Sequence, residues 1–119
     1  MTQEEKQLLL KDLCARLPYG VKVNFRSNIE VLCEVHIYQS VQTVVGERGI
    51  LYDIDMPNVK PYLRPMSSMT EEEYEEFGYD VLRYTPREFD WLNKHHFDYR
   101  GLIEKGLALE APEGMYKIK

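Results

Sequence analysis

Cysteine is scarce in this sequence, and the motifs that commonly mark cofactor and metal sites are missing. The two cysteines, Cys14 and Cys33, lack a CxxC spacing and the dense pattern of small secreted domains. We therefore predict neither a zinc site nor a disulfide framework. We interpret both as buried, reduced thiols, with a single disulfide between them as the alternative. No GxGxxG, GxxxxGKS/T, GxSxG or EF-hand pattern occurs, so we expect no cofactor and no metal.

Long apolar runs and an excess of basic charge are missing too. No run approaches the roughly 20 residues of a membrane-spanning helix. The start, MTQEEKQLLLKDL, carries acids where a signal peptide carries bases. The 20 acidic and 15 basic residues give a net charge of −5, whereas proteins that coat phosphate backbones are rich in Lys and Arg. These features predict a cytoplasmic protein that binds no membrane and for which nucleic acid is an improbable main partner.

The remaining composition is that of an ordinary globular domain. The chain has 119 residues, of which 44% are hydrophobic and 29% charged. A chain of this length buries roughly two thirds of the surface that its unfolded form exposes. We therefore predict one domain, spanning 1–119, that folds without disulfides or a bound metal.

The N-terminal residues predict an amphipathic helix. Thr2 followed by Glu5 has the spacing of a capping box, in which the two side chains satisfy free amides of the first turn. Apolar residues then recur at helical spacing, at Leu9, Leu10, Leu13, Cys14 and Leu17. Pro18 and Gly20 predict the end of this helix.

Residues 21–56 predict an antiparallel meander of about four strands. Apolar and polar residues alternate there, most clearly over 29–37, where we expect the core-facing residues to be Ile29, Val31, Cys33, Val35 and Ile37. Shorter alternating stretches lie at 21–25, 41–45 and 50–56. The segment 57–69 holds three prolines and no regular period, so we predict a structured loop.

The C-terminal half predicts short helices and a closing hairpin. Thr70 with Glu73 repeats the capping box, and Thr85-Pro86 marks another helix start. A further helix over 99–105 and a hairpin over 107–118 complete the chain. The predicted fold class is α+β, with the 21–56 meander packed by an N-terminal helix and by a C-terminal helical segment that ends in a β-hairpin.

Two groups of side chains are candidates for catalytic or metal chemistry, and we favour a structural role for both. His95 and His96 are adjacent, so on a helix their rings point about 100° apart and cannot easily hold one ion, although Asp98 is nearby. Asp53 and Asp55 share one face of a predicted strand, where two carboxylates could divide acid and base work. The simpler interpretation of that pair is a solvated strand face.

The proline-rich segment 58–69 is the most distinctive candidate for a binding site. It concentrates bases, an aromatic ring and hydroxyls within an acidic chain, and the residues that we expect to bind a partner are Lys60, Tyr62, Arg64, Ser67 and Ser68. In the alternative interpretation, Tyr62, Leu63 and Met66 fill the core while Lys60 and Arg64 pair with nearby acids.

Aromatic residues supply a second possible contact surface. The chain has nine tyrosines, four phenylalanines and one tryptophan, and tyrosine and tryptophan are enriched at protein interfaces. A small core cannot bury all of the aromatic residues in the second half, namely Tyr74, Tyr79, Tyr84, Trp91 and Tyr99. We therefore predict a partner surface or a homodimer face.

Three strings of the sequence resemble a known group of proteins. They are LCARLPYGVKV, VKPYLRPMSSMTEEEYEEFG and WLNKHHFDYRGLIEKGLALEAPEGMY. They are similar to small, uncharacterised proteins of gut Bacteroidetes and of their phages or mobile elements. The resemblance covers the C-terminal half and the entry to the predicted meander, and it implies a cytoplasmic, phage-linked protein. It carries over no catalytic residue.

Three functional hypotheses follow from the sequence. The first is a non-catalytic protein-interaction module that uses the 58–69 loop and the exposed aromatic residues, and it is the one we favour. The second is nucleic-acid binding by a winged-helix-like C-terminal half. Its helical part, 86–105, has four bases and four acids, and this zero net charge weakens the hypothesis. The third is a hydrolase or metal-dependent enzyme that uses Asp53, Asp55, His95 or His96.

Overall fold

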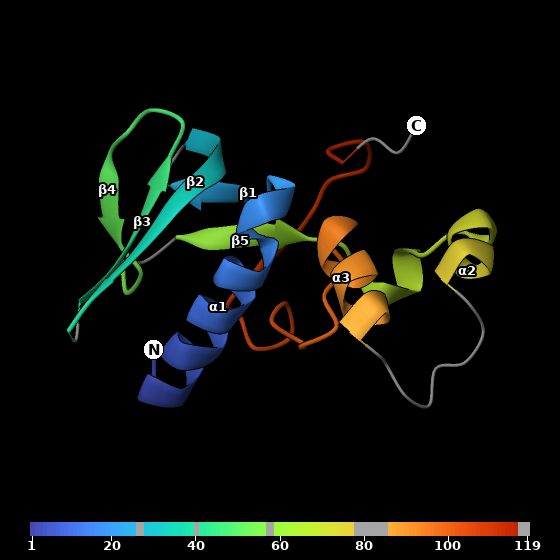
Figure 1. Ribbon diagram of the computed structural model, residues 1–119, viewed down its shortest axis with the longest axis horizontal. Coiled ribbons are helices and arrows are strands. Elements are labelled where there is room, and N and C mark those ends of the chain that lie inside the picture. Colours follow the sequence, from blue (N-terminus) through green and yellow to red (C-terminus); the bar gives the residue numbers. More distant parts are fainter. Residues whose placement is uncertain (26–27, 40, 57–58, 78–85, 117–119) are drawn as a thin grey trace.

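The computed structural model describes residues 1–25, 28–39, 41–56, 59–77 and 86–116. Its centre is a six-stranded mixed sheet in the order β4-β3-β2-β1-β5-β6. The strands are β1 (Lys22–Phe25), β2 (Asn28–Tyr38), β3 (Val41–Gly46), β4 (Leu51–Asp53), β5 (Lys60–Leu63) and β6 (Leu109–Glu110). The helices are α1 (Gln3–Arg16), α2 (Glu71–Phe77) and α3 (Pro86–Lys94), with 3-10 turns at Leu17–Tyr19 and Met66–Ser68. In Figure 1, α1 lies over β1 and β5, β2–β4 form one end of the molecule, and α2 lies at the other.

The α+β class and the predicted first helix are confirmed. Thr2 caps α1 through the full capping box with Glu5, and Glu73 makes the same reciprocal contacts with Thr70 ahead of α2. Pro86 begins α3, while Thr85 lies outside the described residues. None of the described helices is long and apolar enough to cross a bilayer.

The first four strands form the predicted antiparallel meander, but the sheet continues beyond it. β5 pairs antiparallel with β1, placing Pro61 opposite Val23, and β6 pairs parallel with β5. The prediction of a loop over 57–69 is therefore wrong for 60–63. Three prolines argued against a strand because proline has no backbone donor. The ladders on both sides of β5 contain only two residue pairs each, so few donors are required of this strand.

β2 does not keep one face toward the core along its length. The register with β3 shifts between Leu32 and Glu34, which leaves Cys33 as the extra residue of a β-bulge. Before the bulge, Glu30 and Leu32 are buried and Ile29 is 51% exposed; after it, Val35 is the residue that packs against the core. The predicted core face of 29–37 is therefore wrong for Ile29 before the bulge and for Ile37 after it, which is 58% exposed, and Cys33 is exposed rather than buried.

The predicted helix over 99–105 and the predicted hairpin over 107–118 are not formed in the described residues. Turns replace the helix, and the carboxylate of Asp98 accepts hydrogen bonds from the backbone N–H of Leu102 and Ile103 at 2.9 and 3.0 Å. β6 then pairs with β5 instead of with 115–118, of which 117–118 lie outside the described residues. The helix-helix-wing arrangement expected for a winged helix is therefore absent from 86–116.

Two apolar clusters lie in the described part of the chain. The larger one lies between α1 and the sheet and includes Leu9, Leu13, Val23, Phe25, Val44, Leu63 and Leu102. The smaller one joins α2, α3 and the segment after α3, through Met69, Phe77, Leu92 and Phe97. The larger cluster includes residues of β2 and β3, and the smaller one includes Phe77 of α2. These strands and α2 lie at opposite ends of the molecule (Figure 1).

Candidate functional site

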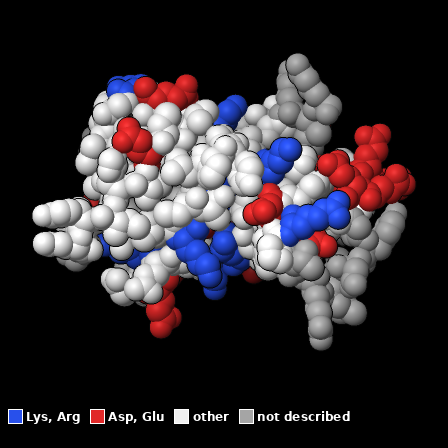
Figure 2. All heavy atoms as spheres, in the orientation of Figure 1, with Lys and Arg blue, Asp and Glu red and all other residues white. Residues whose placement is uncertain are grey.

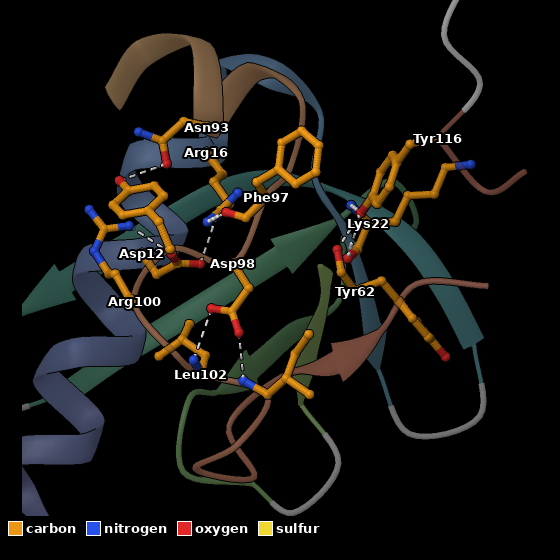
Figure 3. A network of polar contacts seen from close by, with 12 residues as sticks. Asp12, Arg16, Lys22, Tyr62, Asn93, Phe97, Asp98, Arg100, Leu102 and Tyr116 are labelled. Carbon is orange, nitrogen blue, oxygen red and sulfur yellow. Dashed lines mark hydrogen bonds and ion pairs between the residues drawn. The ribbon is translucent and has the colours of Figure 1, made fainter. Parts of the chain in front are cut away.

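A buried ionic network joins α1 to the segment after α3. Asp12 and Arg16 are both 0% exposed. The Nε of Arg16 donates to Asp12 at 2.9 Å, and the Nη1 of Arg100 donates to the other carboxylate oxygen at 2.7 Å. Arg16 also donates to the carbonyl of Phe97. Figure 3 shows that these side chains point toward one another, so the network links α1 to the residues that follow α3.

The network revises the predicted orientation of α1. The buried face of the helix consists of Leu9, Asp12, Leu13 and Arg16, and Cys14 is exposed rather than buried. Its apolar surroundings nevertheless raise the pKa of the Cys14 thiol. Sequence reasoning missed the pair, although an aspartate and an arginine at i, i+4 were the available signal.

The rings of the two histidines contact different aromatic residues. His95 lies against the ring of Trp91, with the ring centroids 4.2 Å apart. His96 is buried against Tyr116 at 3.9 Å and adopts a φ of 63° just after α3. Burial, together with the charge of Arg16, lowers the pKa of His96 to about 3. The ring of His96 is therefore neutral at physiological pH.

The carboxylate pair that we considered for catalysis is not assembled on one strand. Asp53 ends β4, while Asp55 lies in the following turn and forms an ion pair with Lys6 at 2.8 Å. The side chain of Asp53 accepts a hydrogen bond from the backbone N–H of Asp55. Within the described ranges, no three His, Cys, Asp or Glu side chains are grouped so that they could hold a metal ion.

The residues predicted to bind a partner fall into two groups. Lys60 and Tyr62 belong to β5, and the backbone carbonyl of Tyr62 accepts from the hydroxyl of Tyr116 at 2.8 Å. Arg64 donates to both carboxylate oxygens of Glu73 at 2.8 Å. The side chain of Arg64 is thus engaged within the fold, whereas the side chains of Lys60 and Tyr62 are half-buried.

The Arg64–Glu73 pair is itself shielded. The Arg64 guanidinium lies 4.1 Å from the ring centroid of Phe97. Burial raises the pKa of Glu73, but hydrogen bonds from Arg64 and Thr70 outweigh it, so the pKa is below its usual value. The alternative interpretation, in which Arg64 pairs with a nearby acid, therefore describes this residue.

Ser67 and Ser68 are exposed and line a cleft of about 540 Å³. Residues of the segment 65–70 and of the segment 110–114 line the cleft, together with Arg64 and Tyr116. The hydroxyl of Ser68 donates to the carbonyl of Pro65 at 2.7 Å, which fixes the 3-10 turn of the first segment. The exposed carboxylates of Glu110 and Glu113 belong to the second segment. The sequence did not indicate this second segment, because residues 107–118 were predicted to form a hairpin.

Two of the aromatic residues predicted to form a contact surface, Trp91 and Tyr99, are half-buried and make contacts within the fold. Trp91 contacts Phe77 and donates to Glu76, and Tyr99 donates to Asn93 at 3.0 Å. Tyr74 is 41% exposed, whereas Tyr79 and Tyr84 lie outside the described residues. The largest exposed aromatic surface of the described chain is instead at Tyr38, near the end of β2.

Comparison with protein-family models, with curated proteins and with solved structures finds no match to this chain. The resemblance to proteins of gut Bacteroidetes and their phages stays a prediction.

Proposed function

We propose that this protein is a non-catalytic interaction module that holds a segment of a partner protein in the cleft between 65–70 and 110–114. The observation that carries the proposal is the cleft itself. Its volume of about 540 Å³ is within the range of sites that bind a ligand, roughly 300–1,000 Å³. Its walls offer exposed hydroxyl and carboxylate groups next to proline and alanine side chains.

The charge of the cleft defines what the partner segment presents. Arg64 is neutralised by its two hydrogen bonds to Glu73. The remaining charges on the walls are the exposed acids Glu110 and Glu113. A segment with a Lys or Arg side chain and free backbone amides therefore complements the cleft better than an acidic segment, because like charges in close contact disfavour binding.

Site-specific photocrosslinking in lysate of the native host tests this proposal. A photoreactive phenylalanine derivative replaces Ser67 in one variant and Gln7, an exposed residue of α1, in the control variant. We expect a crosslinked partner protein at position 67 that is absent at position 7. The same adduct at both positions, or none at position 67, would refute the cleft as the docking site.

A charge-reversal variant makes the same test quantitative. Glu110→Lys/Glu113→Lys replaces both wall acids on the exposed surface and leaves the Arg64–Glu73 pair in place. We expect the yield of the adduct at position 67 to fall in this variant. An unchanged yield would show that the cleft does not select its partner by charge.

A further inference from the structure

Within the described residues, one edge of the outer half of β2 is unpaired. β1 pairs with β2 only over Asn28–Val31, with one further hydrogen bond from Leu32 to Val21. β2 continues to Tyr38, and over Glu34–Tyr38 the described strands pair with it only on the β3 side. We call the segments Glu34–Tyr38 and Val41–Val45 together the arm. It forms one end of the molecule in Figure 1.

The hydrogen-bond pattern shows which backbone groups the edge offers. Gln42 turns its carbonyl to β4, where it accepts from Ile54. Neighbouring residues of a strand direct their backbone N–H and C=O groups to opposite edges of the strand. The backbone groups of Thr43 and Val45 therefore point to β2. Their partners there are His36 and Glu34.

It follows that Val35 and Ile37, which alternate with those partners along β2, direct their N–H and C=O groups away from β3. These four backbone groups form a short template for another strand.

The side chains at this end of the arm are apolar and exposed. Tyr38 is 73%, Ile37 58% and Val41 50% exposed. Figure 2 shows the projecting end without a charged side chain. Natural edge strands are commonly protected by lysine, proline or a bulge. Here the bulge lies before Glu34, and the residues 34–38 include no lysine and no proline.

We propose that the edge of Glu34–Tyr38 binds an extended, basic and apolar segment of a partner protein, which adds to the sheet as a strand beside β2. In this recognition mode, main-chain hydrogen bonds supply affinity and alternate side chains supply specificity. The surface is distinct from the cleft, so the inference does not depend on the function proposed above.

The charge of the three strands defines the partner. β2, β3 and β4 contain no Lys or Arg, whereas the exposed carboxylate of Glu34 lies on the face opposite Val35, 2.9 Å from the Nε2 of His36. A strand beside β2 complements that face with basic side chains, and it covers Val35 and Ile37 with apolar side chains on the other face.

The exposed area argues against a second copy of the chain. Covering three partly exposed side chains buries on the order of 300 Å², whereas a stable interface needs about 800 Å² from each partner. A second copy would also bring another net charge of −5, which disfavours association.

Amide hydrogen exchange measured by NMR tests this inference on the full chain. In the free protein we expect the amides of Val35 and Ile37 to exchange faster than those of Glu34 and His36. The probe is a short peptide of alternating lysine and valine. Its binding should slow exchange at Val35 and Ile37, whereas a peptide with glutamate in place of lysine should not bind.

A matched pair of variants separates the edge from the rest of the protein. Ile37→Lys introduces a charge at the open edge, and Gln7→Lys introduces the same charge on the exposed surface of α1. We expect Ile37→Lys to weaken binding of the lysine–valine peptide on the order of tenfold, with little change for Gln7→Lys.

Four results would overturn the inference. In the first, the lysine–valine peptide does not bind, and in the second it binds without slowing amide exchange at Val35 and Ile37. In the third, the glutamate peptide binds equally well, and in the fourth, exchange at these amides slows as the protein concentration rises without any peptide. The last result would identify a second copy as the occupant.

Discussion

Removing the carboxylate of Asp12 should destabilise the protein severely, because it would leave the guanidinium of Arg16 buried without its ionic partner. Both side chains are excluded from solvent, and Asp12 also accepts from Arg100. Breaking a buried pair by removing one partner costs about 3–5 kcal/mol. For a domain with about 5–15 kcal/mol of stability, this is a large part of the total.

Urea denaturation measures this loss. The single tryptophan, Trp91, is half-buried and contacts Phe77 and Phe97, so its fluorescence should report unfolding. With a urea dependence of about 1.5 kcal/mol per M, we expect Asp12→Ala to lower the midpoint by roughly 2–3 M.

Two further variants serve as controls for the Asp12→Ala measurement. Asp55→Ala breaks an ion pair with Lys6 of similar length, but on the surface, and it should leave the midpoint nearly unchanged. The double variant Asp12→Leu/Arg16→Met replaces the buried pair by apolar side chains and should recover part of the lost stability, although Arg100 and the carbonyl of Phe97 lose their partners. Equal effects of Asp12→Ala and Asp55→Ala would refute the argument that burial decides the cost.

Two other predictions concern single buried positions. His96 stays neutral in the folded protein because its pKa is lowered to about 3, whereas the unfolded chain takes up a proton near pH 6.5. Its contribution to stability is therefore complete above pH 6.5 and is lost as the pH falls toward 3. Urea midpoints should show that His96→Asn removes about 2 kcal/mol of the stability change between pH 7 and pH 5; an unchanged pH profile would contradict this. Gly46→Ala would place a Cβ 2.7 Å from both Glu30 Oε1 and Phe25 Cε2. We expect this variant to lower the free energy of unfolding by about 1–3 kcal/mol, and a variant as stable as the wild type would contradict this.

Local patterns in the sequence were sufficient for two helix starts and for the order of the first four strands. The capping residues Thr2 and Thr70 act within one helical turn, so a few neighbouring residues determine them. The alternation of apolar and polar residues predicted the meander because the period of a strand is a local property. The bulge at Cys33 escaped this reasoning, because it depends on the register with β3.

The candidate site was predictable only in part. Ser67 and Ser68 were identified from the composition of a proline-rich segment, and they line the cleft. Arg64 belongs to the same segment, but a buried acid nine residues later neutralises it. Whether a basic side chain is available to a ligand depends on its neighbours in space, which the spacing of residues does not reveal.

The sequence by itself determined the α+β class, the start of α1 and the order of the first four strands, because capping and periodicity act over a few residues. Only the tertiary structure decided that 60–63 is a strand inside the sheet, that Asp12 and Arg16 are buried, and that no described strand pairs with the outer edge of Glu34–Tyr38. Each of these outcomes depends on pairing between residues far apart in the chain. Such contacts are favourable only once the whole chain has brought the partners together, so no local pattern encodes them.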